Sequence, residues 1–132
     1  MILAYHAENG QLVVNDRPDP AALAAALWVD LYQPDMATAI TLAGLGLDVP
    51  SLEDMEEIEL SNRLYHDNGV DYMTVVVPGQ NAADEQIAGP VTFILAGGKL
   101  VTVRHHTPRP FVTFPARANK TGHGLSSADQ LF

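Results

Sequence analysis

The sequence contains no cysteine, which excludes disulfide frameworks, thiol nucleophiles and cysteine-ligated zinc or iron–sulfur sites. It also lacks a G-x-S-x-G nucleophile elbow, a phosphate-binding P-loop and a G-x-G-x-x-G fingerprint. No apolar run approaches the roughly 18 to 20 residues of a membrane-spanning helix, and the first residues do not form a signal peptide. We therefore expect the chain as it stands to be soluble and cytoplasmic, without thiol, serine-elbow or nucleotide chemistry.

Basic residues are scarce in the first three-quarters of the chain. Up to Gly98 there are fifteen acidic residues and two basic ones, whereas the remainder carries five basic residues and one acidic residue. The net charge of −9 argues against nucleic acid or an anionic lipid surface as the main partner and fits cationic partners, including metal ions. The basic C-terminal third either meets an acidic surface, on the same molecule or on a neighbouring copy, or is simply solvated.

The length and composition predict one folded domain. A chain of 132 residues with 47% hydrophobic residues can bury a substantial core and is too apolar to be disordered. After Pro115 the sequence becomes polar and glycine-rich, and the last seven residues have the pattern of a helix that has just begun. We predict an α/β domain over residues 1–117 and, over 118–132, a linker followed by the start of a truncated stalk helix.

Three turn signals predict three β-hairpins. Asn9-Gly10, Asn68-Gly69 and Gly97-Gly98 each separate two short runs of strand-forming residues. The polar stretch 79–89, between the second and third hairpins, is predicted to be a loop. A further strand is predicted over 28–32 from its aromatic and β-branched content.

Helices are predicted between these strands. Asp19 precedes a proline and an alanine-rich run, Asp35 precedes a helix that should extend to Leu45, and Ser51 with Asp54 matches the spacing of a capping box. The continuous apolar runs 75–77 and 93–95 indicate strands covered on both faces by helices. The predicted fold class is therefore α/β, an α/β/α sandwich with a mixed, largely antiparallel sheet.

The helix that follows Ser51 carries an unusual concentration of acidic residues. Six acids and no base lie between Asp48 and Glu59, while Leu52, Met55 and Ile58 have the spacing of a buried stripe. Carboxylate oxygens suit hard cations such as Mg²⁺, although one helical turn supplies only part of a coordination shell. The alternative is a solvated acidic surface, since acids near a helix start interact favourably with the helix dipole.

Two adjacent histidines, His105 and His106, are the other residues that could carry chemistry. Neighbouring residues of a strand point to opposite faces, so the pair cannot chelate one ion while the strand continues. A metal-dependent hydrolase would need one of them to converge with the acid cluster at 53–59. A plain protein-interaction module without an ion role is the remaining alternative.

Three ordered stretches resemble the N-terminal cytoplasmic domain of the CorA family of magnesium and cobalt transporters, particularly its proteobacterial branch. Their order and spacing agree over nearly the whole chain. The stretches are Trp28–Leu31 with Pro34-Asp35, Pro50–Met55 followed by Ser61–Tyr65, and Lys99–Arg104.

This resemblance implies a regulatory domain of a membrane transporter, not an enzyme. In the family, such a domain is followed by stalk helices, two membrane helices and a Gly-Met-Asn selectivity loop, none of which is in this sequence. We accordingly expect a fragment that does not conduct ions. The full-length protein would lie at the cytoplasmic face of the bacterial inner membrane and assemble as a homopentamer.

The resemblance also implies two metal ligands. In the family, acidic residues between neighbouring cytoplasmic domains bind divalent cations that hold the channel closed. The family's Leu-Glu-Asp element falls on Leu52-Glu53-Asp54, so Glu53 and Asp54 are the candidate metal ligands. The implied cation is Mg²⁺, with Co²⁺ as a second candidate, and binding should be weak because the partner acids are expected on an adjacent subunit's stalk.

Overall fold

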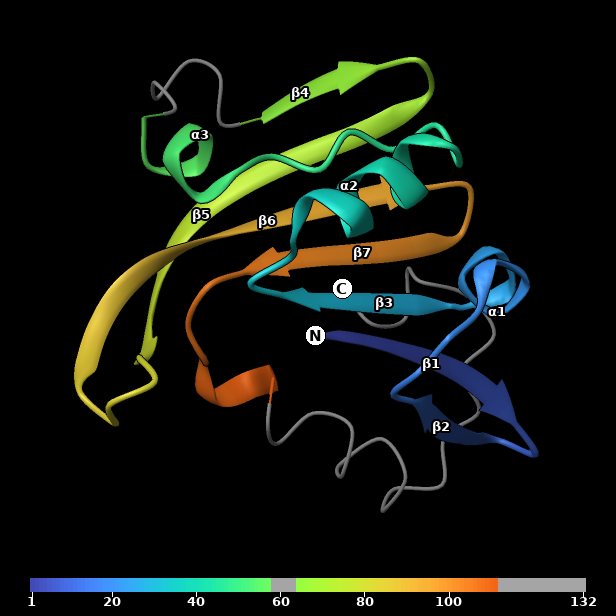
Figure 1. The fold of residues 1–132 in the computed structure, drawn as a ribbon, viewed down its shortest axis with the longest axis horizontal. Coiled ribbons are helices and arrows are strands. Elements are labelled where there is room, and N and C mark those ends of the chain that lie inside the picture. Colours follow the sequence, from blue (N-terminus) through green and yellow to red (C-terminus); the bar gives the residue numbers. More distant parts are fainter. Residues whose placement is uncertain (58–63, 112–132) are drawn as a thin grey trace.

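A computed structural model describes residues 1–57 and 64–111 of the chain (Figure 1). Within them the strands form one seven-stranded sheet in the order β2-β1-β3-β7-β6-β5-β4. Only β3 and β7 pair in parallel, and the other neighbours pair antiparallel. The predicted α/β class and the mixed, largely antiparallel sheet are confirmed. The elements are β1 Ile2–Glu8, β2 Gln11–Asn15, α1 Pro20–Ala25, β3 Trp28–Tyr32, α2 Met36–Ala43, α3 Leu52–Glu57, β4 Leu64–Asp67, β5 Val70–Gln80, β6 Gln86–Ala96 and β7 Lys99–Arg104.

All three predicted hairpins are present. Strands β1 and β2, β4 and β5, and β6 and β7 each pair across a two-residue turn. Both residues of the first turn, Asn9 and Gly10, have positive φ values of 52° and 76°. Such turns match the right-handed twist of the strands, which is why Asn-Gly and Gly-Gly dipeptides select them.

The predicted loop over residues 79–89 is wrong. Strand β5 continues to Gln80 and β6 begins at Gln86, so that only residues 81–85 form a turn. The side chain of Asn81 stabilises this turn, because its Oδ1 atom accepts hydrogen bonds from the backbone N–H groups of Ala83 and Glu85. Pro78 is tolerated because β4 pairs only with the first part of β5, which leaves the rest at an edge of the described sheet.

The predicted helix caps are confirmed. Asp19 accepts a hydrogen bond from the N–H of Ala22 at 2.8 Å, and Asp35 accepts one from Thr38 at 2.8 Å. These carboxylates satisfy N–H groups that have no partner within the helix. Helix α2 ends at Ala43, two residues before the predicted end, where Gly44 is its C-cap.

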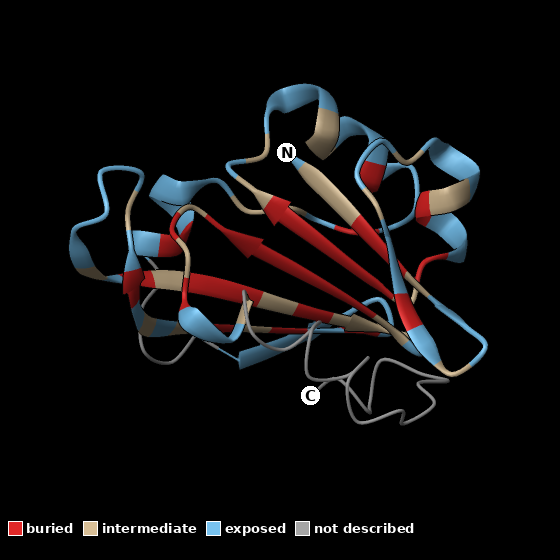
Figure 2. Ribbon diagram, turned by 90° about the horizontal axis from the view of Figure 1, so that it is seen from below, coloured by how far each residue is buried: buried red, intermediate tan, exposed pale blue. Residues whose placement is uncertain are grey.

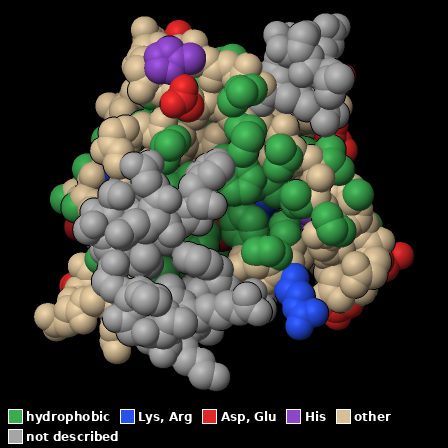
Figure 3. Space-filling view, turned by 180° about the vertical axis from the view of Figure 1, so that it is seen from behind, with side chains coloured by type: hydrophobic (Ala, Val, Ile, Leu, Met, Phe, Trp, Pro, Cys, Tyr) green, Lys and Arg blue, Asp and Glu red, His purple; other side chains and the backbone are tan. Residues whose placement is uncertain are grey.

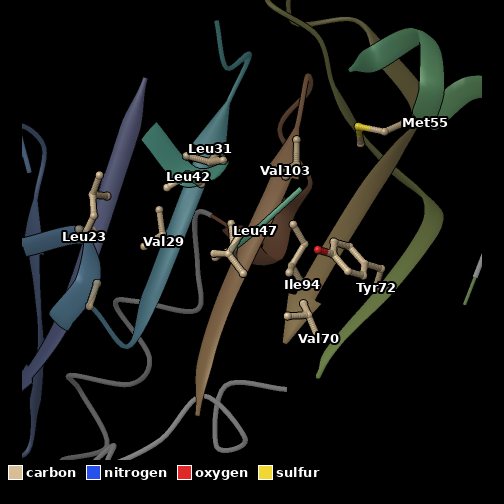
Figure 4. Close-up of a cluster of buried hydrophobic side chains, with 13 residues drawn as sticks. Leu23, Val29, Leu31, Leu42, Leu47, Met55, Val70, Tyr72, Ile94 and Val103 are labelled. Atoms are coloured by element: carbon tan, nitrogen blue, oxygen red, sulfur yellow. The ribbon is translucent and has the colours of Figure 1, made fainter. Parts of the chain in front are cut away.

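The helices cover one face of the sheet, here called the helix face (Figures 1 and 2). Leu23 of α1, Leu42 of α2 and Met55 of α3 are each at most 3% exposed and pack over the central strands (Figure 4). The opposite face, here called the back face, has a smaller buried cluster of Tyr5, Leu12, Trp28 and Leu100. The core therefore lies mainly between the sheet and the three helices.

Of the helical cover predicted on both faces, residues 1–57 and 64–111 show α1, α2 and α3 on the helix face, while on the back face only residues 109–111, at the end of this range, are helical. Val76 in the middle of one run is 53% exposed, since β5 extends beyond the helices. No helix in these ranges is both long and apolar enough to cross a membrane. The linker and helix start predicted over 118–132 lie outside the described residues.

Candidate functional site

Helix α3 carries the two predicted metal ligands, and its first turn is held by a reciprocal pair of hydrogen bonds. The N–H of Asp54 donates to Ser51 Oγ at 3.1 Å, and the N–H of Ser51 donates to Asp54 Oδ2 at 3.4 Å. This is the predicted capping box, with aspartate in place of the usual glutamate. One carboxylate oxygen of Asp54 thus accepts a long hydrogen bond from the backbone.

Met55 anchors α3 to the sheet and turns its acids outward. The Met55 side chain is 3% exposed and points toward the sheet beside Tyr72 (Figure 4). Glu53 and Asp54 are exposed, as are the two glutamates that follow Met55. Leu52, expected to be buried, is 36% exposed, so Met55 alone supplies the described buried contact of α3; Ile58 and Glu59 lie outside the described residues.

The two predicted ligands do not face each other. Neighbouring residues on a helix project in different directions, whereas residues four apart lie side by side. Glu57 is four residues after Glu53 and is exposed on the same side of α3. The sequence-based prediction left Glu57 out, although the i, i+4 spacing was available to identify it.

The chemistry of these donors fits a hard divalent cation, because carboxylate oxygens and retained waters are what Mg²⁺ prefers. Within residues 1–57 and 64–111, however, no three Asp, Glu or His side chains come close enough to hold a metal ion together. Residues Glu53 and Asp54 could therefore supply only part of a coordination shell.

Asp48, another of the acidic residues between 48 and 59, lies near a stacked pair of tyrosines at the β4 edge of the described sheet. The Tyr65 and Tyr72 rings stack at 4.7 Å between centroids, and the Tyr72 hydroxyl accepts a hydrogen bond from the N–H of Asp48. Burial raises the pKa of Tyr65, and the negative charges of Asp48 and Asp67 raise it further. The acidic region thus extends from α3 toward β4.

The two histidines have different surroundings. His106 is 2% exposed, and its Nε2 atom lies 3.0 Å from the carbonyl oxygen of Val77. Its ring fills the space beside Gly79 and Gly89, where a side chain would collide with it. A packed and hydrogen-bonded histidine of this kind has a structural role.

His105 lies nearer the acidic helix. Burial lowers the pKa of its imidazole, and the charge of Glu56 partly opposes that effect. The buried Nε2 atom has no hydrogen-bond partner among the described residues. No third acid or histidine joins this pair in the described part of the chain, so the convergence that a metal-dependent hydrolase requires is not found there.

A buried ion pair joins β3 to β7 on the back face. The Arg104 guanidinium donates to both carboxylate oxygens of Asp30, with the Nη2–Oδ2 distance at 2.8 Å. Thr102 Oγ1 donates to Asp30 Oδ1 and accepts from Trp28 Nε1. Arg104 also lies over the ring of Tyr32, 4.7 Å from its centroid. Each of these polar groups is satisfied by another.

This ion pair joins residues from two of the three stretches on which the family resemblance rests. Asp30 belongs to the first stretch and Arg104 to the last, and the parallel register of β3 and β7 brings them together. Their role is to join two strands that are distant in sequence. The sequence-based prediction missed the pair, since no local pattern reveals a partner 74 residues away.

An apolar pocket of about 370 Å³ lies beside this network on the back face. Its wall includes the segment after β7, where the Phe111 ring lies 6.0 Å from that of Trp28. The lining residues are mainly apolar, with Thr102 and Arg109 as polar members. They are Trp28, Val77, Pro78, Phe93, Leu100, Thr102, Pro108, Arg109, Pro110 and Phe111.

Comparison with known proteins gives a consistent result. The chain is 26% identical over 119 residues to the magnesium transport protein CorA of Escherichia coli K12, which covers 89% of this chain and 38% of that protein. It is 30% identical over 105 residues to the CorA protein of Pasteurella multocida Pm70, covering 79% of this chain and 33% of that protein. No family model matches the chain.

The comparison of folds agrees with the comparison of sequences. The complete CorA magnesium transporter of Methanocaldococcus jannaschii superposes with a TM-score of 0.62 at 12% identity, over 96% of this chain and 39% of that one. The predicted resemblance to the CorA family is confirmed. The soluble domain of the same CorA, solved separately, gives a TM-score of 0.55 at 12% identity, over 90% of this chain and 46% of that one.

The resemblance covers only part of each CorA protein. The chain spans about 38% of the length of the E. coli relative. The part of CorA that this chain matches in fold is the soluble domain.

Proposed function

We propose that this chain is a divalent-cation-sensing regulatory domain of a CorA-type magnesium and cobalt transport protein. The observation that carries the proposal is the similarity to magnesium transport proteins over 89% of the chain, together with the exposed acids of α3. The regulated protein would be a homopentamer in the bacterial inner membrane, with this domain on the cytoplasmic side. The pore would lie in a part of the protein that this sequence does not include.

In this proposal, Glu53 and Asp54 bind a divalent cation at the surface of α3. Since the described residues supply only part of a coordination shell, the remaining ligands are waters or acids from a neighbouring subunit. We expect binding to this chain by itself to be weak, roughly millimolar. Mg²⁺ is the expected ion and Co²⁺ the second.

Regulation would follow from linkage. A cation that binds the closed arrangement of subunits more tightly than the open one shifts the population toward the closed state. The shift cannot exceed the difference between its two affinities. A domain separated from its pore should therefore show binding without gating, and it should show no turnover.

Titration calorimetry with MgCl₂ and CoCl₂ tests the proposal. Asp54→Asn removes one negative charge but keeps an oxygen that can accept the Ser51 hydrogen bond. Asp84→Asn is the matched control, because Asp84 is exposed in a distant turn with φ of 60°, a conformation that asparagine tolerates. We expect Asp54→Asn to weaken binding severalfold and Asp84→Asn to leave it unchanged. Equal binding by the wild type and Asp54→Asn would remove Asp54 from the proposal.

A further inference from the structure

The outer side of α2, turned away from the sheet, carries no charged residue. The sequence between Asp35 and Asp48 contains neither an acid nor a base, and α2 lies on the helix face between α1 and α3 (Figure 1). Met36 is 76% exposed, and Ile40, one turn later, is 66% exposed. We call this side the outer α2 surface; it consists of the exposed residues Met36, Ala37, Ile40, Thr41, Ala43 and Gly44.

Such a surface is unusual for a helix that faces water. A helix at the surface of a soluble protein normally has charged or polar residues opposite its buried stripe, whereas a helix that is apolar all round is buried. In α2, Leu42 is buried against the sheet, yet the side opposite to it is apolar as well. The hydroxyl of Thr41 donates to the carbonyl oxygen of Ala37 within the helix, so it adds little polarity. The pattern therefore favours a protein contact on the outer α2 surface.

The back face differs from the outer α2 surface in this respect. Figure 3 shows that the hydrophobic side chains on the back face have acidic, basic and histidine side chains at their margins. The outer α2 surface has no such margin within α2 itself, and no other element among residues 1–57 and 64–111 covers it. It is therefore the surface whose exposure to water most needs an explanation.

We propose that a neighbouring copy of this chain contacts the outer α2 surface, head to tail. The inference rests on the proposed function, in which a neighbouring subunit completes the cation shell at Glu53 and Asp54. Helices α2 and α3 cover the same face of the sheet, so a subunit that reaches the α3 acids from outside also faces α2 (Figure 1). The outer α2 surface would form the apolar part of this interface and the α3 acids its charged rim.

The uneven charge of the chain favours a head-to-tail contact over a two-fold one. Residues up to Gly98 carry fifteen acids and two bases, a net charge of −13, whereas the remainder carries five bases and one acid, a net charge of +4. A two-fold contact through α2 would bring the acids of both α3 helices into one interface, where like charges repel. A head-to-tail contact lets the basic C-terminal third of one copy meet the acidic helix face of the next. Repeated around an axis, such a contact can close into a ring, as a homopentamer requires.

Sedimentation equilibrium of the 132-residue protein in EDTA tests the proposal, with Ile40→Glu as the disrupting variant. Glutamate is a good helix former and the site is exposed, so the fold should be kept, while the buried charge should weaken association at least about tenfold. Met36→Glu is a second variant with the same expected effect. Val14→Glu is the matched control, because Val14 is 52% exposed on β2, at an edge of the described sheet, and we expect this variant to associate like the wild type.

Two results of this experiment would overturn the proposal. One is a wild type that remains monomeric up to about 1 mM protein. The other is association that survives Ile40→Glu and Met36→Glu. Circular dichroism confirms the fold of each variant.

A single cysteine distinguishes the head-to-tail contact from a two-fold one. The chain has no cysteine, so Ile40→Cys introduces a unique thiol. In a two-fold contact through α2, the two thiols would lie close together, and oxidation with copper phenanthroline would link them by a disulfide. In a head-to-tail contact each thiol faces a different surface, so we expect cross-linking no faster than for Val14→Cys. Rapid cross-linking specific to position 40 would contradict the head-to-tail arrangement.

Magnesium separates this inference from the proposed function. If both hold, MgCl₂ tightens the association of the wild type severalfold, and Asp54→Asn removes this gain without weakening the association in EDTA. If association depends on Ile40 but MgCl₂ has no effect at matched ionic strength, the α2 contact stands and the cation-sensing role fails. If Mg²⁺ binds at Asp54 while Ile40→Glu leaves association unchanged, only the α2 contact fails.

Discussion

The two faces of the sheet bury their side chains by different means, although the same strands supply both. Val101 and Val103 of β7 point to the helix face and are completely buried in an apolar core. Thr102 and Arg104, which alternate with them, point to the back face and are buried in a polar network with Asp30. The helix face is stabilised by apolar area, whereas the centre of the back face is stabilised by partners that satisfy one another.

The two faces also differ in how much apolar surface the described residues leave uncovered. The helix face leaves little apolar surface uncovered at the centre of the sheet, because α1, α2 and α3 each place a side chain there. The back face keeps half-buried apolar side chains on β5 and β6, next to an open pocket. The acids proposed to bind cations lie on the other side of the sheet, on the outer surface of α3.

The largest effect should come from breaking the polar network. Asp30→Asn leaves the buried Arg104 guanidinium without its counter-charge, and we expect a loss of about 3–5 kcal/mol in the free energy of unfolding. Urea denaturation measures this loss. The double variant Asp30→Leu with Arg104→Met removes both charges and should lose much less. A loss below about 1 kcal/mol for Asp30→Asn would show that the pair does not stabilise the back face.

Truncation of matched leucines should give the next largest effect and compare the faces directly. Leu42 of α2 is 1% exposed on the helix face, while Leu95 of β6 is half-buried on the back face. We expect Leu42→Ala to cost about 2–5 kcal/mol in urea denaturation, because it leaves a cavity in the core. Leu95→Ala should cost clearly less, since water already reaches the site. Equal losses would contradict the proposed difference between the faces.

A smaller effect should come from the cap of α3. Ser51→Ala removes the hydroxyl that accepts from the N–H of Asp54, and we expect a loss of about 1 kcal/mol. Ser51→Thr keeps a capping hydroxyl and should recover most of the stability. Thermal unfolding of the three proteins measures the effect. If alanine and threonine behave alike, the capping box does not hold α3.

The smallest effect concerns pH. Burial lowers the pKa of His105 below its ordinary value of 6.5, so the folded protein favours the neutral imidazole. The corresponding stability is present above that ordinary value and is lost as the pH falls through the lowered pKa. Thermal unfolding from about pH 8 to about pH 5 should show a smaller decrease for His105→Gln than for the wild type. Identical pH profiles would show that His105 does not contribute.

Local signals in the sequence predicted local structure well. Asn9-Gly10 specified a hairpin, Asp19 and Asp35 specified helix starts, and Ser51 with Asp54 specified a capping box, because each depends on neighbours within a few residues. Polar composition misled at residues 79–89, where backbone pairing between β5 and β6 continues whatever the side chains are.

Features that depend on distant contacts could not be predicted. The pairing of Asp30 with Arg104 follows from the parallel register of β3 and β7, which no local pattern reveals. For the candidate site, the sequence predicted which acids α3 carries but not that Leu52 is partly exposed, because that depends on how α3 packs against the sheet.

The position of the bound cation tests the central claim most directly. Mn²⁺ is a paramagnetic substitute for Mg²⁺ that broadens the NMR signals of nearby amides, so a titration of ¹⁵N-labelled protein locates the ion without any mutation. The account predicts that the amide signals of residues 52–57 broaden first and that excess Mg²⁺ restores them. Broadening centred on another part of the chain, such as His66 and Asp71, or spread evenly over the surface, would contradict the assignment of Glu53 and Asp54.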